Sequence, residues 1–217
     1  MADVFNEVDE ELRQEQYKKL WKKYGKYVAA VAVVVVLGTA GSVGWKEYKI
    51  AARESESARF VAAVRLIESG DPAQGSAALA ALAEDAGSGY RTLARLRQAA
   101  ALREAGDHGV AVSVYDRLVT DGDADKNLRD LARLLAAQAM LDLGTAKEGV
   151  VKRLEPLLTD DNPWRYSARE LLGALALQEG DIDTATREFT ALSDDLTAPP
   201  GIRARAAELL AAVRYGN

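Results

Sequence analysis

The stretch YVAAVAVVVVLGTAGSVGW, residues 27–45, contains no charged residue. A helix rises about 1.5 Å per residue, so this stretch would extend about 28 Å, close to the ~30 Å hydrocarbon thickness of a bilayer. Only the hydroxyls of Thr39 and Ser42 interrupt its apolar surface, whereas a core helix of a soluble domain would carry a polar stripe. The sequence therefore predicts a transmembrane helix.

Aromatic and basic residues flank this stretch, as in the interfacial belts of membrane proteins. Lysines precede it together with Trp21, Tyr24 and Tyr27, while Trp45 and Tyr48 stand at its other end. A cleaved secretion leader is the alternative, because small residues at 40–42 could form a cleavage site. Such a leader would be unusually long and acidic at its start, so we favour a retained anchor.

The distribution of basic residues predicts the orientation of the span. Six Lys and Arg precede it, and the four that follow closely are accompanied by three glutamates. This bias favours a cytoplasmic N-terminus and a C-terminal part on the far side of the membrane, which in a bacterium is the periplasm. The predicted organisation is a cytoplasmic amphipathic tail (1–26), a transmembrane helix (27–45), a connector (46–54) and a periplasmic helical-repeat domain (55–217).

The tail itself has two interpretations. Phe5, Val8 and Leu12 recur at helical spacing among acidic residues, which is typical of an amphipathic helix that binds a partner. A solvated extension of the membrane helix fits the same residues.

Composition limits what the remaining chain can do. The protein has 217 residues, a net charge of -5, no cysteine and one histidine. From Lys46 onward, 22 Lys and Arg face 27 Asp and Glu, so no basic patch favours nucleic acid. Thiolate catalysis is excluded, and an ordinary zinc site is not expected.

A repeat runs through residues 55–217. Glycines stand between apolar helical runs at Gly70, Gly106, Gly144 and Gly180, with spacings of 36, 38 and 36 residues. An Ala-Arg pair precedes each glycine at a fixed offset, and the series continues to a fifth pair. The pairs are Ala58-Arg59, Ala94-Arg95, Ala132-Arg133, Ala168-Arg169 and Ala204-Arg205.

Small residues recur on both sides of the glycines. Seven positions before each glycine stand Ala63, Ala99, Ala137 and Gly173, and five positions after stand Gly75, Ala111, Gly149 and Ala185. Small residues at matching places allow close helix packing, so we predict an all-α protein whose domain is a solenoid of about four stacked helical hairpins. The last segment, with Gly216 at the matching offset, would be a C-terminal capping helix.

The turns of this repeat also have a physical basis. Glycine can adopt positive φ at a helix end, and Asp71, Asp107 and Asp181 would cap the helices that follow. Asn162-Pro163 would begin a further helix in the same way. In the third unit Leu154 lies one place later than its equivalents, which indicates an extra residue in the turn.

The pattern resembles tetratricopeptide repeats, best in LLGALALQEGDIDTATREFTAL. Together with FNEVDEELRQEQYKKLWKKYGKYV and the single span, the whole chain resembles the YfgM-like family, ancillary subunits of the SecYEG translocon of Gram-negative inner membranes. The resemblance implies association with SecYEG and with a periplasmic chaperone such as PpiD, in support of newly exported proteins. It implies no cofactor and no catalytic site.

The residues that could carry chemistry do not form a recognised site. His108 lies in a predicted turn, where we expect it to be exposed rather than catalytic. The segment 121–125 alternates acids like a calcium loop, but Lys126 and Ala132 stand where that loop needs Gly and Glu. We expect an inter-helix loop that supplies caps. A hydrolase is the remaining enzymatic alternative, although no spacing indicates a nucleophile with its base.

Two sets of residues are candidate contact sites. The repeated arginines, Arg59, Arg95, Arg133, Arg169 and Arg205, could form a ladder toward a partner or could pair within the domain. In the span, the pairs Gly38/Ser42 and Ala40/Gly44 could admit another membrane helix, or could reflect ordinary membrane composition.

We predict an adaptor beside the translocon rather than an enzyme. An accessory subunit of another inner-membrane complex is the alternative.

Overall fold

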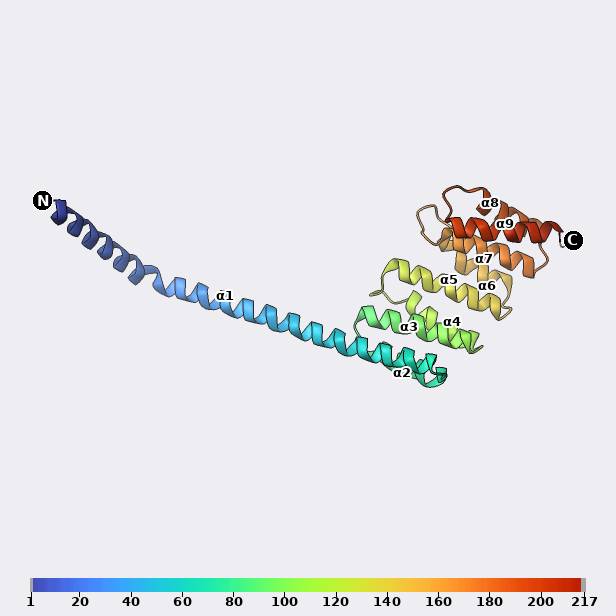
Figure 1. The fold of residues 1–217 in the computed structure, drawn as a ribbon, viewed down its shortest axis with the longest axis horizontal. Coiled ribbons are helices and arrows are strands. Elements are labelled where there is room, and N and C mark those ends of the chain that lie inside the picture. The colour runs from blue at the N-terminus through green and yellow to red at the C-terminus, as the bar shows by residue number, and fades with distance from the viewer. Residues whose placement is uncertain (1, 216–217) are drawn as a thin grey trace. The chain divides into compact units, whose positions relative to one another are not determined.

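The computed structural model describes the backbone of residues 2–215 and the side chains of residues 17–213. Regular structure in this part of the chain is entirely helical, so the predicted all-α class is confirmed (Figure 1). The helices are α1 (Ala2–Glu68), α2 (Pro72–Asp85), α3 (Ser88–Glu104), α4 (His108–Val119), α5 (Lys126–Asp142), α6 (Lys147–Leu154), the 3₁₀ helix η1 (Glu155–Leu157), α7 (Arg165–Gln178), α8 (Ile182–Asp194) and α9 (Pro200–Tyr215).

The chain forms two compact units, Met1–Glu54 and Ser55–Asn217. The first unit consists of the part of α1 up to Glu54. From Tyr17 onward, α1 is long and apolar enough to cross a membrane, and its most apolar 18-residue window has a mean hydropathy of 2.0. Its side chains from Val28 to Tyr48 are all exposed, as expected of a helix whose surroundings are lipid. Phe5, Val8, Leu12 and Gly216 lie outside the described side chains.

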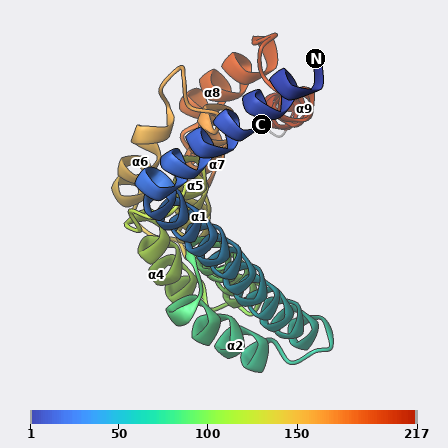
Figure 2. The same cartoon turned by 90° about the vertical axis from the view of Figure 1, so that its left-hand side faces the viewer.

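The second unit is a curved stack of helical hairpins. The last part of α1 pairs with α2, and the pairs α3/α4 and α7/α8 follow the same plan, with α9 at the end. In Figure 2 the second helices of the pairs, α2, α4, α6 and α8, follow the outer side of the curve. The first helices therefore line the inner side.

Each hairpin turns at a glycine, as the spacing predicts. Within the described backbone, the residues with positive φ are Gly70, Gly106, Gly144 and Gly180, at 93°, 87°, 69° and 74° respectively. At the first turn the Asp71 amide donates to the Leu66 carbonyl, and the Gly70 amide donates to the Ile67 carbonyl. The same pair of bonds recurs at the other three turns. This arrangement satisfies the last helical carbonyls, and it requires the left-handed conformation that glycine adopts freely.

The predicted caps are present at two of the three aspartates. The Asp71 carboxylate accepts from the Gln74 amide and that of Asp181 from the Thr184 amide, each at 3.0 Å. The Asp107 side chain makes no cap hydrogen bond, so that prediction is wrong. Asn162 also does not start α7 directly. Its side-chain oxygen accepts from the Trp164 amide, and this tight turn delays the helix until Arg165.

The third hairpin contains the extra residue. Its second helix α6 begins three residues after Gly144, whereas α2, α4 and α8 begin two residues after their glycines. Counted from the helix start, Val150 and not Gly149 is therefore the equivalent of Gly75, Ala111 and Ala185. Val150 is fully buried, while Gly149 is only partly buried. The predicted alignment of the repeats, which placed Gly149 at this position, is therefore wrong by one residue.

The core lies between the helices of successive hairpins. Large side chains seven residues into each second helix fill it, and they are almost completely buried. They are Leu79, Tyr115, Leu154 and Phe189. The terminal helix α9 closes the stack through Ala206 and Leu210. Ala204 itself is exposed, so α9 presents a different face from the one that the 36-residue offset predicts.

Gly173→Ala is predicted to destabilise the repeat domain by about 1–3 kcal/mol, the usual cost of overpacking. A Cβ at Gly173 would lie 2.6 Å from Cε1 of Phe189, a fully buried ring that has no room to withdraw. Urea unfolding of a fragment comprising residues 55–217, followed by circular dichroism, measures the change.

Gly149→Ala in the same fragment is the matched control. The added Cβ would lie 3.1 Å from the flexible end of the Met140 side chain and at an ordinary contact distance of 3.8 Å from Cγ2 of Thr145, so the midpoint should hardly change. Equal destabilisation by both variants would mean that the Phe189 contact does not limit the packing.

Candidate protein-interaction surfaces

A groove of about 370 Å³ opens between three of the inner helices. Helix α5 contributes Leu134 and Gln138, α7 contributes most of the floor, and α9 contributes Arg205 at one edge. The α7 residues are Ser167, Glu170, Leu171 and Ala174. The lining thus combines apolar side chains with amide, hydroxyl and charged groups in about equal share, which suits an extended polypeptide with alternating side chains.

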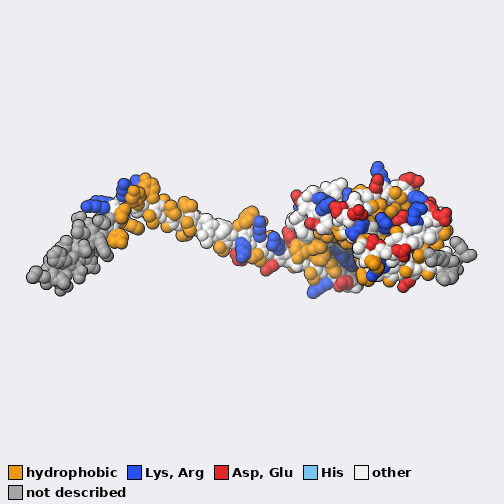
Figure 3. Space-filling view, turned by 90° about the horizontal axis from the view of Figure 1, so that it is seen from above, with side chains coloured by type: hydrophobic (Ala, Val, Ile, Leu, Met, Phe, Trp, Pro, Cys, Tyr) orange, Lys and Arg blue, Asp and Glu red, His pale blue; other side chains and the backbone are white. Residues whose placement is uncertain are grey.

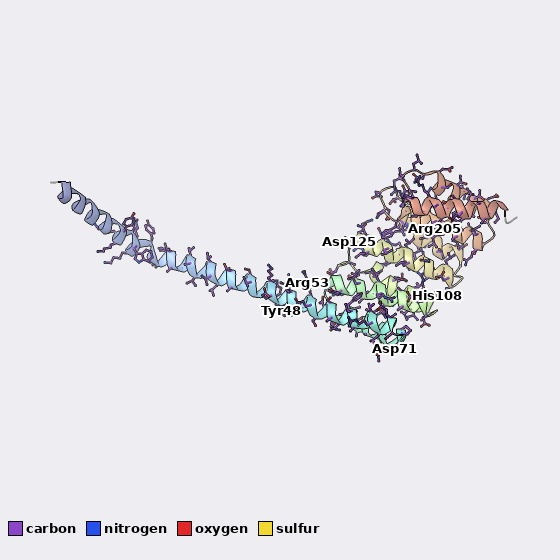
Figure 4. All side chains as sticks on the ribbon, in the orientation of Figure 1. Tyr48, Arg53, Asp71, His108, Asp125 and Arg205 are labelled. Atoms are coloured by element: carbon purple, nitrogen blue, oxygen red, sulfur yellow. The ribbon has the colours of Figure 1, made fainter. Side chains whose placement is uncertain are left out.

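An ion pair closes one side of this groove. Arg205 donates to both carboxylate oxygens of Glu170, through Nε at 2.7 Å and Nη2 at 2.9 Å. These hydrogen bonds and the negative charge of Glu170 raise the pKa of the Arg205 guanidinium above its usual value. The two-point contact joins α9, where Figure 4 labels Arg205, to α7, and the Arg205 side chain is 57% exposed.

A buried polar cluster fixes α5 against the turn before α7. The side-chain amide of Asn162 donates to the Asp130 carboxylate at 3.0 Å, and both residues are buried. Lys126 and Arg133 pair with the same carboxylate, at 2.9 and 2.7 Å. Nearby, the indole N–H of Trp164 donates to a backbone carbonyl of α5. These bonds set the separation of two helices that line the groove.

The repeated arginines pair within the domain, and each finds a different partner. Arg59 donates to Asp85 at 3.0 Å, Arg95 to Asp121 at 2.6 Å and Arg133 to Asp130 at 2.7 Å. Arg169 lies 3.9 Å from Glu188, and Arg205 pairs with Glu170. The structure therefore does not bring the five side chains together as a free ladder. Only Arg205 lines the groove, and a role of the others in binding stays a prediction.

The small residues of the span lie on an exposed helix surface. Gly38 and Gly44 have open space where a side chain would project, and so does Gly41, which lies between them in the chain. The Ser42 hydroxyl donates to the Thr39 carbonyl of its own helix, at 2.8 Å. This surface would let another helix approach closely but would offer it no side-chain hydrogen bond from Ser42. A partner for it stays a prediction.

His108 is the first residue of α4 rather than an exposed turn residue, so that expectation is wrong. It is partly buried because the hairpin packs its first turn against the end of α5, where its Nδ1 lies 3.9 Å from the Asp142 carboxylate (Figure 4). Arg103 contacts the same carboxylate at 3.5 Å. These contacts connect the start of α4 and the end of α3 to the end of α5.

The acidic loop at 121–125 supplies caps and an ion pair. Asp121 accepts from Arg95 and from the Asp123 amide, and Asp125 accepts from the Asn127 amide at the start of α5. Among the described residues no three His, Cys, Asp or Glu side chains could hold a metal ion together.

A stack of helical hairpins with a groove along its inner helices defines a helical-repeat interaction protein. The chain belongs to the family of tetratricopeptide repeat-like domains, which it matches over residues 18–206. Comparison with curated proteins and with solved structures found no match. Domains of this family bind other proteins and are typically non-catalytic. Membership of the YfgM-like family in particular stays a prediction.

The sequence analysis did not identify the groove residues, although the repeat contains a signal for them. Leu134 and Glu170 occupy one repeat position, and Gln138 and Ala174 occupy another, each pair being 36 residues apart. These positions face the inner side of the stack. A comparison of the residues at equivalent positions in successive units, polar in one and apolar in another, would have indicated a binding surface there. Which units come close enough to form a groove depends on the tertiary packing.

Asn162→Ala is predicted to destabilise the 55–217 fragment by about 1–3 kcal/mol. It removes the amide that pairs with the buried carboxylate of Asp130 and leaves that charge less satisfied. Asn127→Ala is the control, because Asn127 contributes only its backbone carbonyl to Trp164 and keeps that group after the change. Urea unfolding of both variants, monitored by circular dichroism, gives the comparison, and equal midpoints would exclude a structural role for the Asp130–Asn162 bond.

Proposed function

We propose that this protein is a single-pass adaptor of the bacterial inner membrane, with a cytoplasmic N-terminus and a periplasmic repeat domain. Its span would bind the SecYEG translocon, and its repeat domain would bind a periplasmic chaperone such as PpiD, so that the chaperone acts on newly exported proteins. The observation that carries the proposal is that one helix, α1, supplies both an apolar span and the first helix of a grooved repeat domain.

The properties of the span support anchoring. The backbone is helical throughout, so every main-chain polar group within it has a partner. The hydroxyls of Thr39 and Ser42 donate to carbonyls of the same helix, at 2.8 Å each. The span therefore carries no unsatisfied polar group into lipid, and its glycine-rich surface would allow a neighbouring helix to approach closely.

The properties of the groove support binding of a polypeptide. Leu134 and Leu171 offer apolar contact, while the side chains of Gln138 and Ser167 could exchange hydrogen bonds with a peptide backbone. The Arg103 guanidinium donates to Gln138 at 3.2 Å, which orients the amide. A groove that combines a held amide with apolar side chains favours a protein ligand over a small metabolite.

Exchange of residues 27–45 for an unrelated leucine-rich helix is predicted to weaken co-purification with the translocon, because leucine side chains would fill the surface around Gly38 and Gly44. Chaperone binding by the repeat domain should persist. Purification in mild detergent followed by mass spectrometry reports both contacts. Retention of the translocon by the exchanged protein would contradict a contact through the span.

Ala174→Arg is predicted to abolish chaperone binding, because a long charged side chain would occupy the groove floor. Val110→Arg is the control: Val110 is 53% exposed on the outer helix α4, so the same side chain is added away from the groove. Pull-down with the 55–217 fragment measures both, and circular dichroism verifies that both fold.

The two experiments also separate the proposal from its alternative. If the span and the groove variants both lose subunits of a different inner-membrane complex, the protein is an accessory subunit of that complex instead. If the groove variant and its control bind chaperone equally, the groove is not the binding surface.

A further inference from the structure

Residues 17–27 of α1 form a helix with two chemically opposite faces. Successive residues turn by about 100°, so the five lysines fall within an arc of about 140°. They are Lys18, Lys19, Lys22, Lys23 and Lys26. The opposite side, an arc of about 120°, carries only apolar and aromatic residues. These are Tyr17, Leu20, Trp21, Tyr24 and Tyr27.

Both faces are available for contact. The five apolar and aromatic side chains are between 47% and 73% exposed. Figure 3 shows lysine side chains gathered beside apolar ones where the described side chains begin. Gly25 is the one buried residue of the segment, because the Trp21 ring lies over it: a Cβ there would be 3.3 Å from that ring. The ring is thereby held along the helix.

The segment contains lysines but no acidic residue. No Asp or Glu occurs between Tyr17 and Lys46, so residues 17–45 carry a net charge of +5. Lys18 and Lys22 form no ion pair within the described residues. Lys23 and Lys26 place their ammonium groups 5.2 and 5.1 Å from the ring centres of their neighbouring tyrosines, an interaction that leaves their charge intact.

We infer that residues 17–27 form an interfacial helix that selects phospholipids with a net negative headgroup, such as phosphatidylglycerol, around the membrane anchor. The aromatic face would lie at the boundary of the acyl chains, and the lysine face would contact the phosphates. We assign the contact with the lipid phosphates to Lys18, Lys22, Lys23 and Lys26. The inference rests on membrane insertion of the span, but not on the translocon or the chaperone.

A lipid fits this surface better than a soluble anion. The aromatic face lies opposite the lysines and would stay in water if a soluble polyanion occupied the lysine face, whereas a membrane interface contacts both faces at once. The segment also continues directly into the apolar span, within the same helix. A lysine at an anionic membrane surface favours association about five-fold, so four lysines suffice for a marked preference.

Spin-labelled lipids test this inference on the full-length protein in phosphatidylcholine vesicles. Electron paramagnetic resonance measures the fraction of labelled phosphatidylglycerol or phosphatidylcholine that is immobilised at the protein surface. We expect labelled phosphatidylglycerol to associate several-fold more strongly than labelled phosphatidylcholine, and the preference to fall at 1 M salt, because salt screens exposed charges. Inorganic phosphate at millimolar concentration should not displace the lipid. Displacement at that concentration would indicate a free-anion site and overturn the inference.

Two charge variants make the test specific. K22Q/K23Q should reduce the preference several-fold, and the quadruple variant K18Q/K22Q/K23Q/K26Q should bring it to about unity. K46Q/K49Q is the matched control beyond the span, where Glu47 and Glu54 already offset the lysines, and it should retain most of the preference. An unchanged preference in the quadruple variant would overturn the inference.

Vesicle flotation distinguishes the possible failures. If the wild-type protein does not float with vesicles after alkaline extraction, membrane insertion itself fails, and with it the proposed function. If it floats but shows no preference for phosphatidylglycerol, only the lipid inference fails. The quadruple variant should float like the wild type, because residues 27–45 are unchanged.

Discussion

The repeat domain depends on the close approach of two helices at positions that hold almost no side chain. At Gly75 a Cβ would lie 2.7 Å from the Ala63 carbonyl oxygen and 2.5 Å from the Ile67 side chain, so the first two helices touch through their backbones. In the last full hairpin the Phe189 ring fills the space above Gly173. Packing at this distance fixes the two helices of each of these hairpins against each other. Helix α7, which contributes most of the groove residues, is held in this way.

The turns could be predicted because their determinants are local. Each turn needs one residue with positive φ and a small set of main-chain hydrogen bonds, and glycine meets that need wherever the tertiary structure allows a hairpin. The four spaced glycines therefore identified all four turns. The caps were less predictable, because a cap hydrogen bond depends on the rotamer of one side chain. Asp71 and Asp181 adopt it, while Asp107 does not.

The two errors in the predicted alignment of the repeats, at Gly149 and at Ala204, have a common physical origin. A fixed offset from the glycine assumes that every second helix begins at the same distance from its turn, and one added residue in the third hairpin moves Val150 into the buried position. A fixed offset also assumes that every helix presents the same face. The terminal helix α9 packs without a following hairpin, so it turns Ala206 inward instead of Ala204.

The contacts that shape the groove could not be read from the sequence. Asp130 and Asn162 are 32 residues apart, and Arg205 and Glu170 are 35 apart. The repeated arginines reveal their partners only in part. Arg59 and Arg95 each pair with an aspartate 26 residues further on, whereas Arg133 pairs with Asp130 of its own helix. Periodicity identifies which positions face the neighbouring unit, but it does not fix which acid lies opposite in the later units.

The first and last hairpins of the stack each have one face without a neighbouring hairpin, and the two faces differ in how they are covered. At the C-terminal end, α9 covers the last hairpin and buries Ala206 and Leu210. At the other end Ala58 is exposed, although its equivalents Ala94, Ala132 and Ala168 are completely buried against a preceding hairpin. An exposed alanine costs little, because its methyl group presents a small apolar area to water. A repeat that packs through alanine can therefore begin directly from α1 without a separate N-terminal cap.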